Sequence, residues 1–80
     1  MTELVDALRQ LGLQGEVSFS GRWAKLEGEH CAIFVVEAAR GGYYTWCDDP
    51  AARAVQFHIN PVEAIQAGVQ RAAHQAGDAG

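Results

Sequence analysis

The sequence predicts an α+β domain, with an antiparallel sheet of four to five strands flanked by an N-terminal and a C-terminal helix (order α-β-β-β-β-α). Apolar residues recur at helical spacing at both ends of the chain, they alternate with polar residues in between, and glycine-containing turns separate the alternating segments. The length of 80 residues is that of one domain. We assign residues 1–75 to this domain and expect residues 76–80, which have nothing to bury, to form a disordered tail.

The first helix is predicted from an apolar stripe near the N-terminus. Its members lie on one helical face: Leu4, Val5, Leu8 and Leu11. Gly12 follows as a C-terminal stop, and Leu13 can reach back to Leu8, which is the apolar contact of a Schellman ending. We therefore expect a short helix that stops at Gly12.

The middle of the chain predicts the sheet. Val17 and Phe19 alternate with polar residues, residues 20–21 can turn, and residues 23–27 return as the second strand of a hairpin. Residues 32–36 are all apolar, which is typical of a central strand covered on both faces. After a turn at residues 38–42, an aromatic strand occupies residues 43–47. Val55, Phe57 and Ile59 then share one face of a last strand.

The C-terminal helix begins after Asn60. The side chain of Asn60 can cap the helix, and Pro61 and Glu63 are favoured in a first turn. Apolar residues follow at helical spacing: Val62, Ile65, Val69, and Ala72 or Ala73. Gly68 costs about 1 kcal/mol relative to alanine inside a helix, which indicates either a close approach to another backbone or a tolerated glycine.

The charge of the chain argues against duplex nucleic acid as a partner. The net charge is -4, the pI is about 5.1, and the six Lys and Arg residues are widely spread. The order of elements is similar to that of double-stranded RNA-binding domains. Those domains carry a lysine cluster at the start of the second helix, where this chain has residues 60–63, Asn-Pro-Val-Glu.

Features of secreted and membrane proteins are missing from the sequence. The N-terminus has neither the basic nor the apolar region of a signal peptide, and no apolar stretch approaches the roughly 18 residues of a membrane span. We therefore expect a cytoplasmic protein of bacterial type with no membrane partner. In that compartment Cys31 and Cys47 are reduced thiols.

The two cysteines are not expected to form a disulfide or a metal site. A turn within residues 38–42 would pair Cys47 with residues 34–36 and leave Cys31 about 10–17 Å away, whereas a disulfide needs alpha carbons within about 7 Å. Residues of metal-binding type are present, but their spacing is not that of a zinc site: His30, Cys31, Cys47, Asp48 and His58. We predict no metal and no cofactor.

Catalytic patterns are equally weak. A cysteine nucleophile with His58 as its base would need a supporting motif, and neither cysteine lies in one. Asp48 and Asp49 are explained by the capping of one helical turn that begins at Pro50. The glycines at 41–42 lack the following helix that a phosphate-binding loop needs. We predict no catalytic residue.

The aromatic strand at residues 43–47 carries the functional prediction. Neighbouring residues of a strand point to opposite faces, so Tyr44 and Trp46 share one face while Tyr43, Thr45 and Cys47 share the other. Either set could be core, or an exposed platform for a partner. The two helices could cover both faces of the sheet, or a second copy of the chain could cover one.

Our first hypothesis is a small non-catalytic protein-interaction module of accessory or regulatory type, acting by itself or as a homodimer, whose partner is another protein or a second copy. Its predicted surface consists of Tyr43, Tyr44, Trp46, Trp23 and Arg40. The alternative is a small-ligand-binding module in which the same aromatic residues line a pocket between sheet and helix. In that case Arg40, Arg53 or His58 would orient a polar group of the ligand. A cysteine-dependent enzyme or a zinc-binding protein is a third hypothesis.

Overall fold

The computed structural model describes residues 3–28, 31–48 and 54–78, and it has the predicted α+β fold. In chain order the elements are α1 (Glu3–Leu11), β1 (Glu16–Val17), β2 (Trp23–Glu27), β3 (Ala32–Glu37), β4 (Tyr43–Cys47), β5 (Gln56–His58) and α2 (Pro61–Asp78). The five strands form one sheet in the order β1-β2-β3-β4-β5, and each is antiparallel to its neighbours. The predicted fold class is confirmed.

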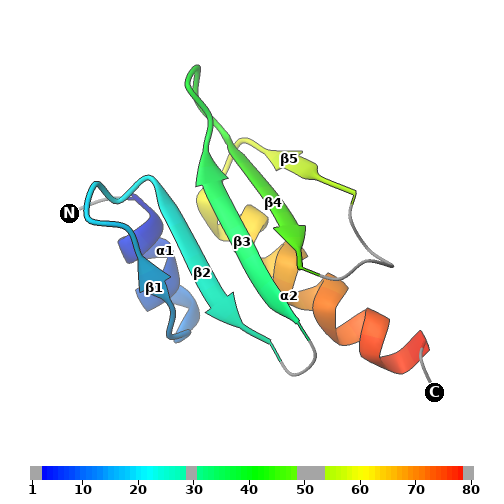
Figure 1. Ribbon diagram of the computed structural model, residues 1–80. Coiled ribbons are helices and arrows are strands. Elements are labelled where there is room, and N and C mark those ends of the chain that lie inside the picture. The colour runs from blue at the N-terminus through cyan, green and yellow to red at the C-terminus, as the bar shows by residue number, and fades with distance from the viewer. Residues whose placement is uncertain (1–2, 29–30, 49–53, 79–80) are drawn as a thin grey trace.

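Both helices lie on the same face of the sheet (Figure 1). α2 contacts β3, β4 and β5, and α1 packs against α2. The core between helices and sheet consists of Leu4, Ala7, Leu8, Ala24, Leu26, Ile33, Val35, Tyr43, Cys47, Ala64, Ile65 and Ala72. In the described part of the chain no helix or strand covers the opposite face, which we call the open face.

β3 is the central strand, as predicted, but the helices cover one of its faces. Ile33 and Val35 are buried on the covered face, whereas Phe34 and Val36 point to the open face and are half-buried. The prediction of cover on both faces is therefore corrected. Neighbouring side chains of the sheet itself shield the second face, and the ring of Phe34 stacks on that of Trp46.

α1 ends as the sequence predicts. Gly12 has a φ of 69°, and its N–H donates to Arg9 O at 3.1 Å. The N–H of Leu13 donates to Leu8 O at 3.0 Å. These are the two hydrogen bonds of a Schellman motif, and the motif places Leu13 against the core.

The hairpin between β1 and β2 turns earlier than predicted. Phe19, which the sequence places on the first strand, lies in the turn with its side chain fully exposed. The cause is Ser18, whose Oγ accepts the backbone N–H groups of Arg22 and Trp23 at 3.0 and 3.2 Å. Gly21 completes the turn with a φ of 77°. β1 is therefore only two residues long.

The loop between β3 and β4 sets the register of the aromatic strand. The N–H of Ala38 donates to Gly42 O at 2.9 Å across this loop. Cys47 lies opposite Ile33, whereas the sequence predicted a position opposite residues 34–36. The difference arises because all of residues 38–42 belong to the loop and none extends a strand. Cys31 and Cys47 are both present as thiols.

α2 begins at the predicted cap. Asn60 Oδ1 accepts the N–H of Val62 at 2.8 Å, and the N–H of Ala64 donates to Asn60 O at 3.0 Å. The first of these bonds satisfies an amide that the start of a helix leaves without a partner. The helix continues to Asp78, into the segment 76–80 that the sequence assigns to a disordered tail.

Gly68 lets α2 approach the sheet closely. A Cβ at this position would lie 2.5 Å from Ile33 Cγ2 and 2.9 Å from Thr45 Oγ1. The Sγ of Cys47 donates to Gly68 O at 3.8 Å from the same side. Of the two interpretations of this glycine, the structure supports a close approach, to side chains of β3 and β4 rather than to backbone.

Candidate functional site

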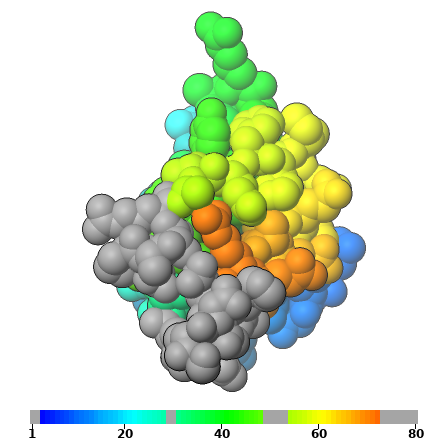
Figure 2. Space-filling model, turned by 90° about the vertical axis from the view of Figure 1, so that its right-hand side faces the viewer, coloured from blue at the N-terminus to red at the C-terminus, as the bar shows by residue number. Residues whose placement is uncertain are grey.

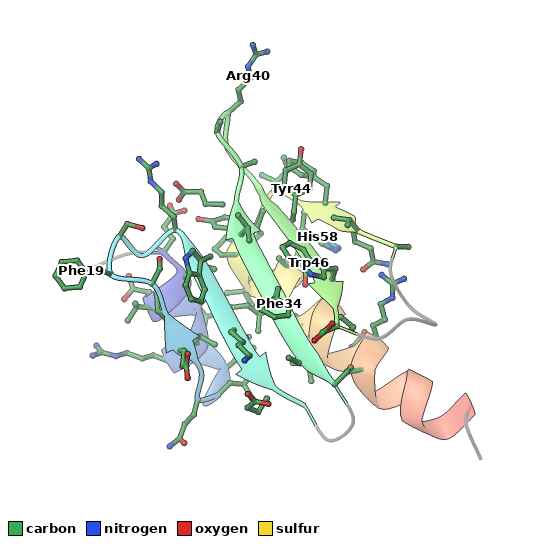
Figure 3. The ribbon with its side chains drawn as sticks, viewed as in Figure 1. Phe19, Phe34, Arg40, Tyr44, Trp46 and His58 are labelled. Carbon is green, nitrogen blue, oxygen red and sulfur yellow. The ribbon has the colours of Figure 1, made fainter. Side chains whose placement is uncertain are left out.

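The open face gathers most of the aromatic side chains of the chain (Figure 3). Two rows of paired residues run across its strands: Trp23-Val36-Tyr44-Phe57 and Lys25-Phe34-Trp46. The sequence has three Phe, two Trp and two Tyr, and five of these seven residues lie in the two rows. The open face is thus the aromatic face of the sheet, while aliphatic residues dominate the covered face.

The rings of the open face pack against one another. Phe34 and Trp46 stack with centroids 5.5 Å apart and planes 18° apart. Tyr44 and Phe57 make an edge contact with centroids 5.2 Å apart and planes 60° apart. Such pairs contribute roughly 0.5–1.5 kcal/mol beyond their buried area. The rings are therefore held in position before any partner binds.

Three rings of the open face remain accessible to a partner. The exposed fractions of Trp23, Tyr44 and Phe57 are 42%, 44% and 46%. Strands about 4.8 Å apart with a rise of about 3.3 Å per residue give a face of five strands and five residues an area of up to about 400 Å². The largest apolar patch of a typical monomer covers about 300–600 Å² and is often functional. The exposed rings of Trp23, Tyr44 and Phe57 are the apolar part of the open face that a partner could cover.

Charge on the open face is sparse. Among the described residues, Lys25 is the one cation on it, and its Nζ lies 3.7 Å from Glu27 Oε1 and 6.0 Å from the ring centroid of Phe34. Glu16 lies opposite Lys25 on the neighbouring strand. Nucleic acids are bound through several cations along their phosphates. The open face does not have the charge of such a surface.

Trp23, Tyr44 and Trp46, three residues predicted for the interaction surface, lie on the open face. Tyr43 does not belong to it: this residue is 2% exposed on the covered face, and its OH donates to Glu3 Oε2 at 2.5 Å. Burial raises the pKa of Tyr43 well above its ordinary value, and the hydrogen bond to Glu3 makes a smaller contribution in the same direction. A residue beside Tyr44 in a strand must face the other way.

Phe34 and Phe57 complete the open face, and both are missing from the surface that the sequence predicts. The signal for Phe57 is its alternation with Val55 and Ile59, which gives the strand one apolar face. Phe34 lies within five successive apolar residues, so its sequence neighbours do not reveal which face it takes. Its position follows from the pairing with Trp46.

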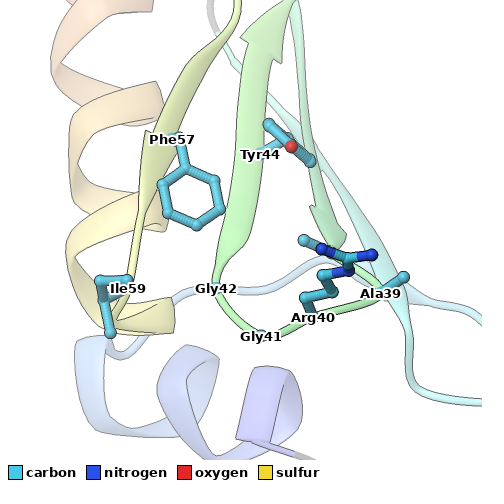
Figure 4. Close-up of a pocket in the computed structure, with 8 residues that line it drawn as sticks. Ala39, Arg40, Gly41, Gly42, Tyr44, Phe57 and Ile59 are labelled. Atoms are coloured by element: carbon cyan, nitrogen blue, oxygen red, sulfur yellow. The ribbon is translucent and has the colours of Figure 1, made fainter.

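Arg40 lies at the tip of the loop between β3 and β4, away from the centre of the sheet (Figure 3). A shallow hollow beside it is lined by Ala38, Ala39, Arg40, Gly41, Gly42, Tyr44, Phe57 and Ile59 (Figure 4). The ring of Phe57 packs directly on Gly42, because a Cβ on that glycine would overlap the ring atoms. A guanidinium beside two aromatic rings can hold a planar or anionic group.

The alternative hypothesis predicts a pocket lined by aromatic residues between sheet and helix. The rings of the open face lie on the other side of the sheet, away from both helices. The cleft on the helical side is lined by Leu13, Gln14, Leu26, Glu27, Gly28, Ile33, Val69 and Ala72, none of them aromatic. His58 pairs with Tyr43 on the covered side, and among the described residues its buried Nε2 has no hydrogen-bond partner. Arg53, His30 and the predicted helical turn at Asp49 and Pro50 lie outside the described residues.

Cys47 has the surroundings of a core residue. It is 1% exposed and contacts the backbone of α2. His58 lies opposite Tyr43, four residues along the strand from Cys47, which corresponds to about 13 Å. Proton transfer between two side chains needs a separation of about 3 Å. The described residues also hold no group of three or more His, Cys, Asp or Glu that could bind a metal ion.

Comparison of the chain with protein-family models, with curated proteins and with solved structures found no match. No helix within the described ranges is both long enough and apolar enough to cross a membrane.

Proposed function

We propose that this protein is a small non-catalytic protein-interaction module, of accessory or regulatory type, whose open face binds another protein. The observation that carries the proposal is the segregation of five of the seven aromatic side chains onto the face without helices. Aromatic residues dominate the energetics of protein interfaces. In the part of the chain that the structure describes, this face has one cation and packed rings, which suits binding to a protein surface better than binding to a polyanion.

Preorganised rings favour binding because little side-chain freedom is lost when the partner arrives. The stacked pair Phe34 and Trp46 and the edge pair Tyr44 and Phe57 already have fixed neighbours. Trp23, at the other end of the first row, is 42% exposed and extends the apolar surface to β2. We place the protein in the cytoplasm, a compartment in which the two thiols would stay reduced.

The test uses the two tryptophans of the chain, because Trp23 and Trp46 both lie on the open face. Peptides selected from a random library against the folded protein should shift the tryptophan emission on binding. Trp23→Ser and Tyr44→Ser should each lower the affinity for the selected peptides about 30-fold. This corresponds to the loss of about 2 kcal/mol of binding free energy at an interface anchor.

Phe19→Ser is the control, since it removes an aromatic ring that is even more exposed than Trp23 and Tyr44 from a turn outside the open face. This variant should bind the selected peptides like the wild type, and circular dichroism should show all variants folded. The proposal is contradicted if replacing the open-face aromatics changes neither peptide binding nor self-association, or if Phe19→Ser weakens binding as much as they do.

A small ligand is the second candidate, and the hollow beside Arg40 supports it. Its guanidinium, with the rings of Tyr44 and Phe57, would hold an aromatic carboxylate or a similar planar anion. A ligand at 100 times its dissociation constant adds about 2.7 kcal/mol to the free energy of unfolding. A thermal-shift screen of planar carboxylates should therefore find a hit that Arg40→Ala abolishes, while no shift in the screen would remove this candidate.

A further inference from the structure

β5 (Gln56–His58) is an edge strand, and Phe57 together with the residues that flank the strand exposes apolar side chains at this edge. Val55, Phe57 and Ile59 alternate in this segment and are 57%, 46% and 76% exposed. Native edge strands usually carry charged residues or proline, because an unprotected edge recruits other strands. Residues 54–60 contain neither. In Figure 2 the yellow-green atoms of this segment form part of the surface.

The opposite edge of the sheet is protected in the usual way. β1 is only two residues long, and one of them is the exposed Glu16. Short edge strands and edge charges both discourage pairing with another chain; β5 is also short, with three residues, but it carries no edge charge. The two edges therefore differ, and the exposed apolar alternation is found on β5.

β5 is held in a fixed position by the rest of the fold. Arg71 Nη1 donates to Ala54 O at 2.5 Å just before the strand, and Phe57 is held between Tyr44 and Gly42. A strand that is already extended and anchored loses little conformational freedom when a second strand pairs with it. The edge is thus ready for such a partner.

The sequence of this segment is complementary to itself. Residues 55–59 read apolar, polar, aromatic, polar, apolar, with Phe57 at the centre. In an antiparallel pair centred on Phe57, Val55 of one copy lies opposite Ile59 of the other on the open face, and the two Phe57 rings meet. Gln56 lies opposite His58 on the other face, where an amide and an imidazole can hydrogen-bond. Each side chain meets a neighbour of matching polarity.

We propose that a second copy of this chain pairs antiparallel with β5, centred on Phe57, to give one continuous sheet of ten strands, five from each copy. This dimer has the two-fold symmetry that is commonest among small proteins. It also joins the two open faces into one larger aromatic surface. The proposal goes beyond the binding role of the open face and does not depend on it.

The proposed interface is small. A paired segment of five residues is about 17 Å long, and interfaces below about 1,200 Å² belong to the weak class. Sedimentation velocity from about 1 µM to about 1 mM should therefore show the mass rise toward twice that of the 8.6 kDa chain.

Charged substitutions at Val55 and Ile59 test both the edge and its register. Both side chains are more than half exposed, so their replacement should leave the monomer folded. Val55→Lys with Ile59→Lys, or Val55→Glu with Ile59→Glu, places like charges opposite each other, and each double variant should be monomeric. Mixing the two should restore the dimer as a heterodimer.

The matched control is Val55→Lys with Ile59→Glu. Its introduced lysine faces the introduced glutamate of the second copy, so this variant should dimerise by itself although it carries as many charges as the others. A wild type that stays monomeric to 1 mM overturns the proposal, as does a dimer that persists when both positions are lysine. A monomeric Lys/Glu variant overturns the register.

The test of the β5 dimer can be distinguished from the test of peptide binding to the open face. Trp23→Ser should leave the dimer intact, because Trp23 lies on β2 whereas the proposed contact is made along β5, at the opposite side of the sheet. Loss of the dimer in Trp23→Ser would move self-association to the open face and overturn the edge proposal. A wild type that dimerises through β5 but binds no peptide would remove the proposed function and leave the dimer standing.

Discussion

α2 packs closely on the sheet because Gly68 has no side chain. Its neighbours across the interface are Ile33 and Thr45, both almost fully buried. An added methyl group would meet Ile33 Cγ2 at 2.5 Å, a distance at which one of the two elements must move. The sequence shows a helical glycine at a cost of about 1 kcal/mol, and the structure shows what offsets that cost.

We expect Gly68→Ala to lower the free energy of unfolding. The gain in helix propensity is about 1 kcal/mol, whereas an overpacked core costs about 1–3 kcal/mol. Urea unfolding followed by circular dichroism measures the balance. Gln66→Ala, at an exposed position of the same helix, serves as the control and should change the stability by less than about 0.5 kcal/mol. A more stable Gly68→Ala protein would show that the helix can move away from the sheet without loss.

Tyr43 links β4 to the start of α1 through Glu3, and its substitution should expose that link. Tyr43→Phe removes the hydrogen bond to Glu3 and should cost about 1 kcal/mol at neutral pH. The raised pKa of Tyr43 adds a pH dependence. Unfolded tyrosine releases its proton near pH 10 while the folded protein retains it, so stability is fully present below about pH 10 and falls above it.

Unfolding curves between pH 7 and pH 11 test this dependence. The alkaline loss of stability should be smaller in Tyr43→Phe than in the wild type. Tyr44→Phe is the matched control, because it removes an exposed hydroxyl from the open face and should keep the wild-type pH profile. Equal alkaline slopes in all three proteins would show that the Tyr43 proton is not linked to folding.

Tyr43 and Tyr44 also show what the sequence could establish at the level of residues. Alternation in a strand predicts that they face opposite ways, and the structure confirms it. The sequence could not say which of the two is buried, because that depends on which face the helices choose. The helices cover the face that carries Tyr43, and they do so through contacts between residues that are far apart in the chain.

At the level of elements, the loop between β3 and β4 positions β5 as well as β4. Gly42 has a φ of 85° and supports the ring of Phe57. Gly41 has a φ of 97°, and among the described residues no atom lies within 4 Å of the place that an added methyl group would take. Both glycines adopt backbone angles that other residues rarely take. They differ in that Gly42 also touches the edge strand.

We expect Gly42→Ala to be more damaging than Gly41→Ala. Gly41→Ala should cost about 1 kcal/mol, the penalty of a left-handed backbone. Gly42→Ala should lose at least about 1 kcal/mol more, because the ring of Phe57 must leave its place and β5 with it. Amide exchange of residues 56–58 should accelerate in Gly42→Ala and not in Gly41→Ala. Equal behaviour of the two variants would mean that the ring does not hold β5.

The elements themselves were largely within reach of sequence patterns. Local chemistry specifies the Schellman ending at Gly12 and the cap at Asn60, and both are found. The β1–β2 turn and the β3–β4 register were predicted less well, since several polar or glycine-rich positions compete for each turn. A bond from Ser18 Oγ decides the first turn. Local sequence patterns do not reveal which face of the sheet stays uncovered by the helices.

At the level of the whole molecule, the cysteines measure how cooperatively the fold opens. Cys47, the last residue of β4, is 1% exposed and contacts α2, whereas Cys31, just before β3, is half-buried. A thiol reagent can reach Cys47 when helix and sheet separate, and that separation exposes the whole core. The rate of labelling at Cys47 should then report the free energy of global unfolding.

We expect Cys47 to react about 10³–10⁴ times more slowly than an unfolded thiol, as for a domain with a stability near 5 kcal/mol. Cys31 should react much faster, since a local movement exposes it. Labelling of the wild type with a maleimide, followed by peptide mass spectrometry, resolves the two sites, and Cys31→Ser removes any influence of the first reaction on the second. Rapid labelling of Cys47 in the folded state would place a reactive thiol in the core and revive the hypothesis of a cysteine-dependent enzyme. Slow labelling whose denaturant dependence matches global unfolding would instead show that Cys47 is a core residue whose thiol becomes accessible when the whole domain unfolds.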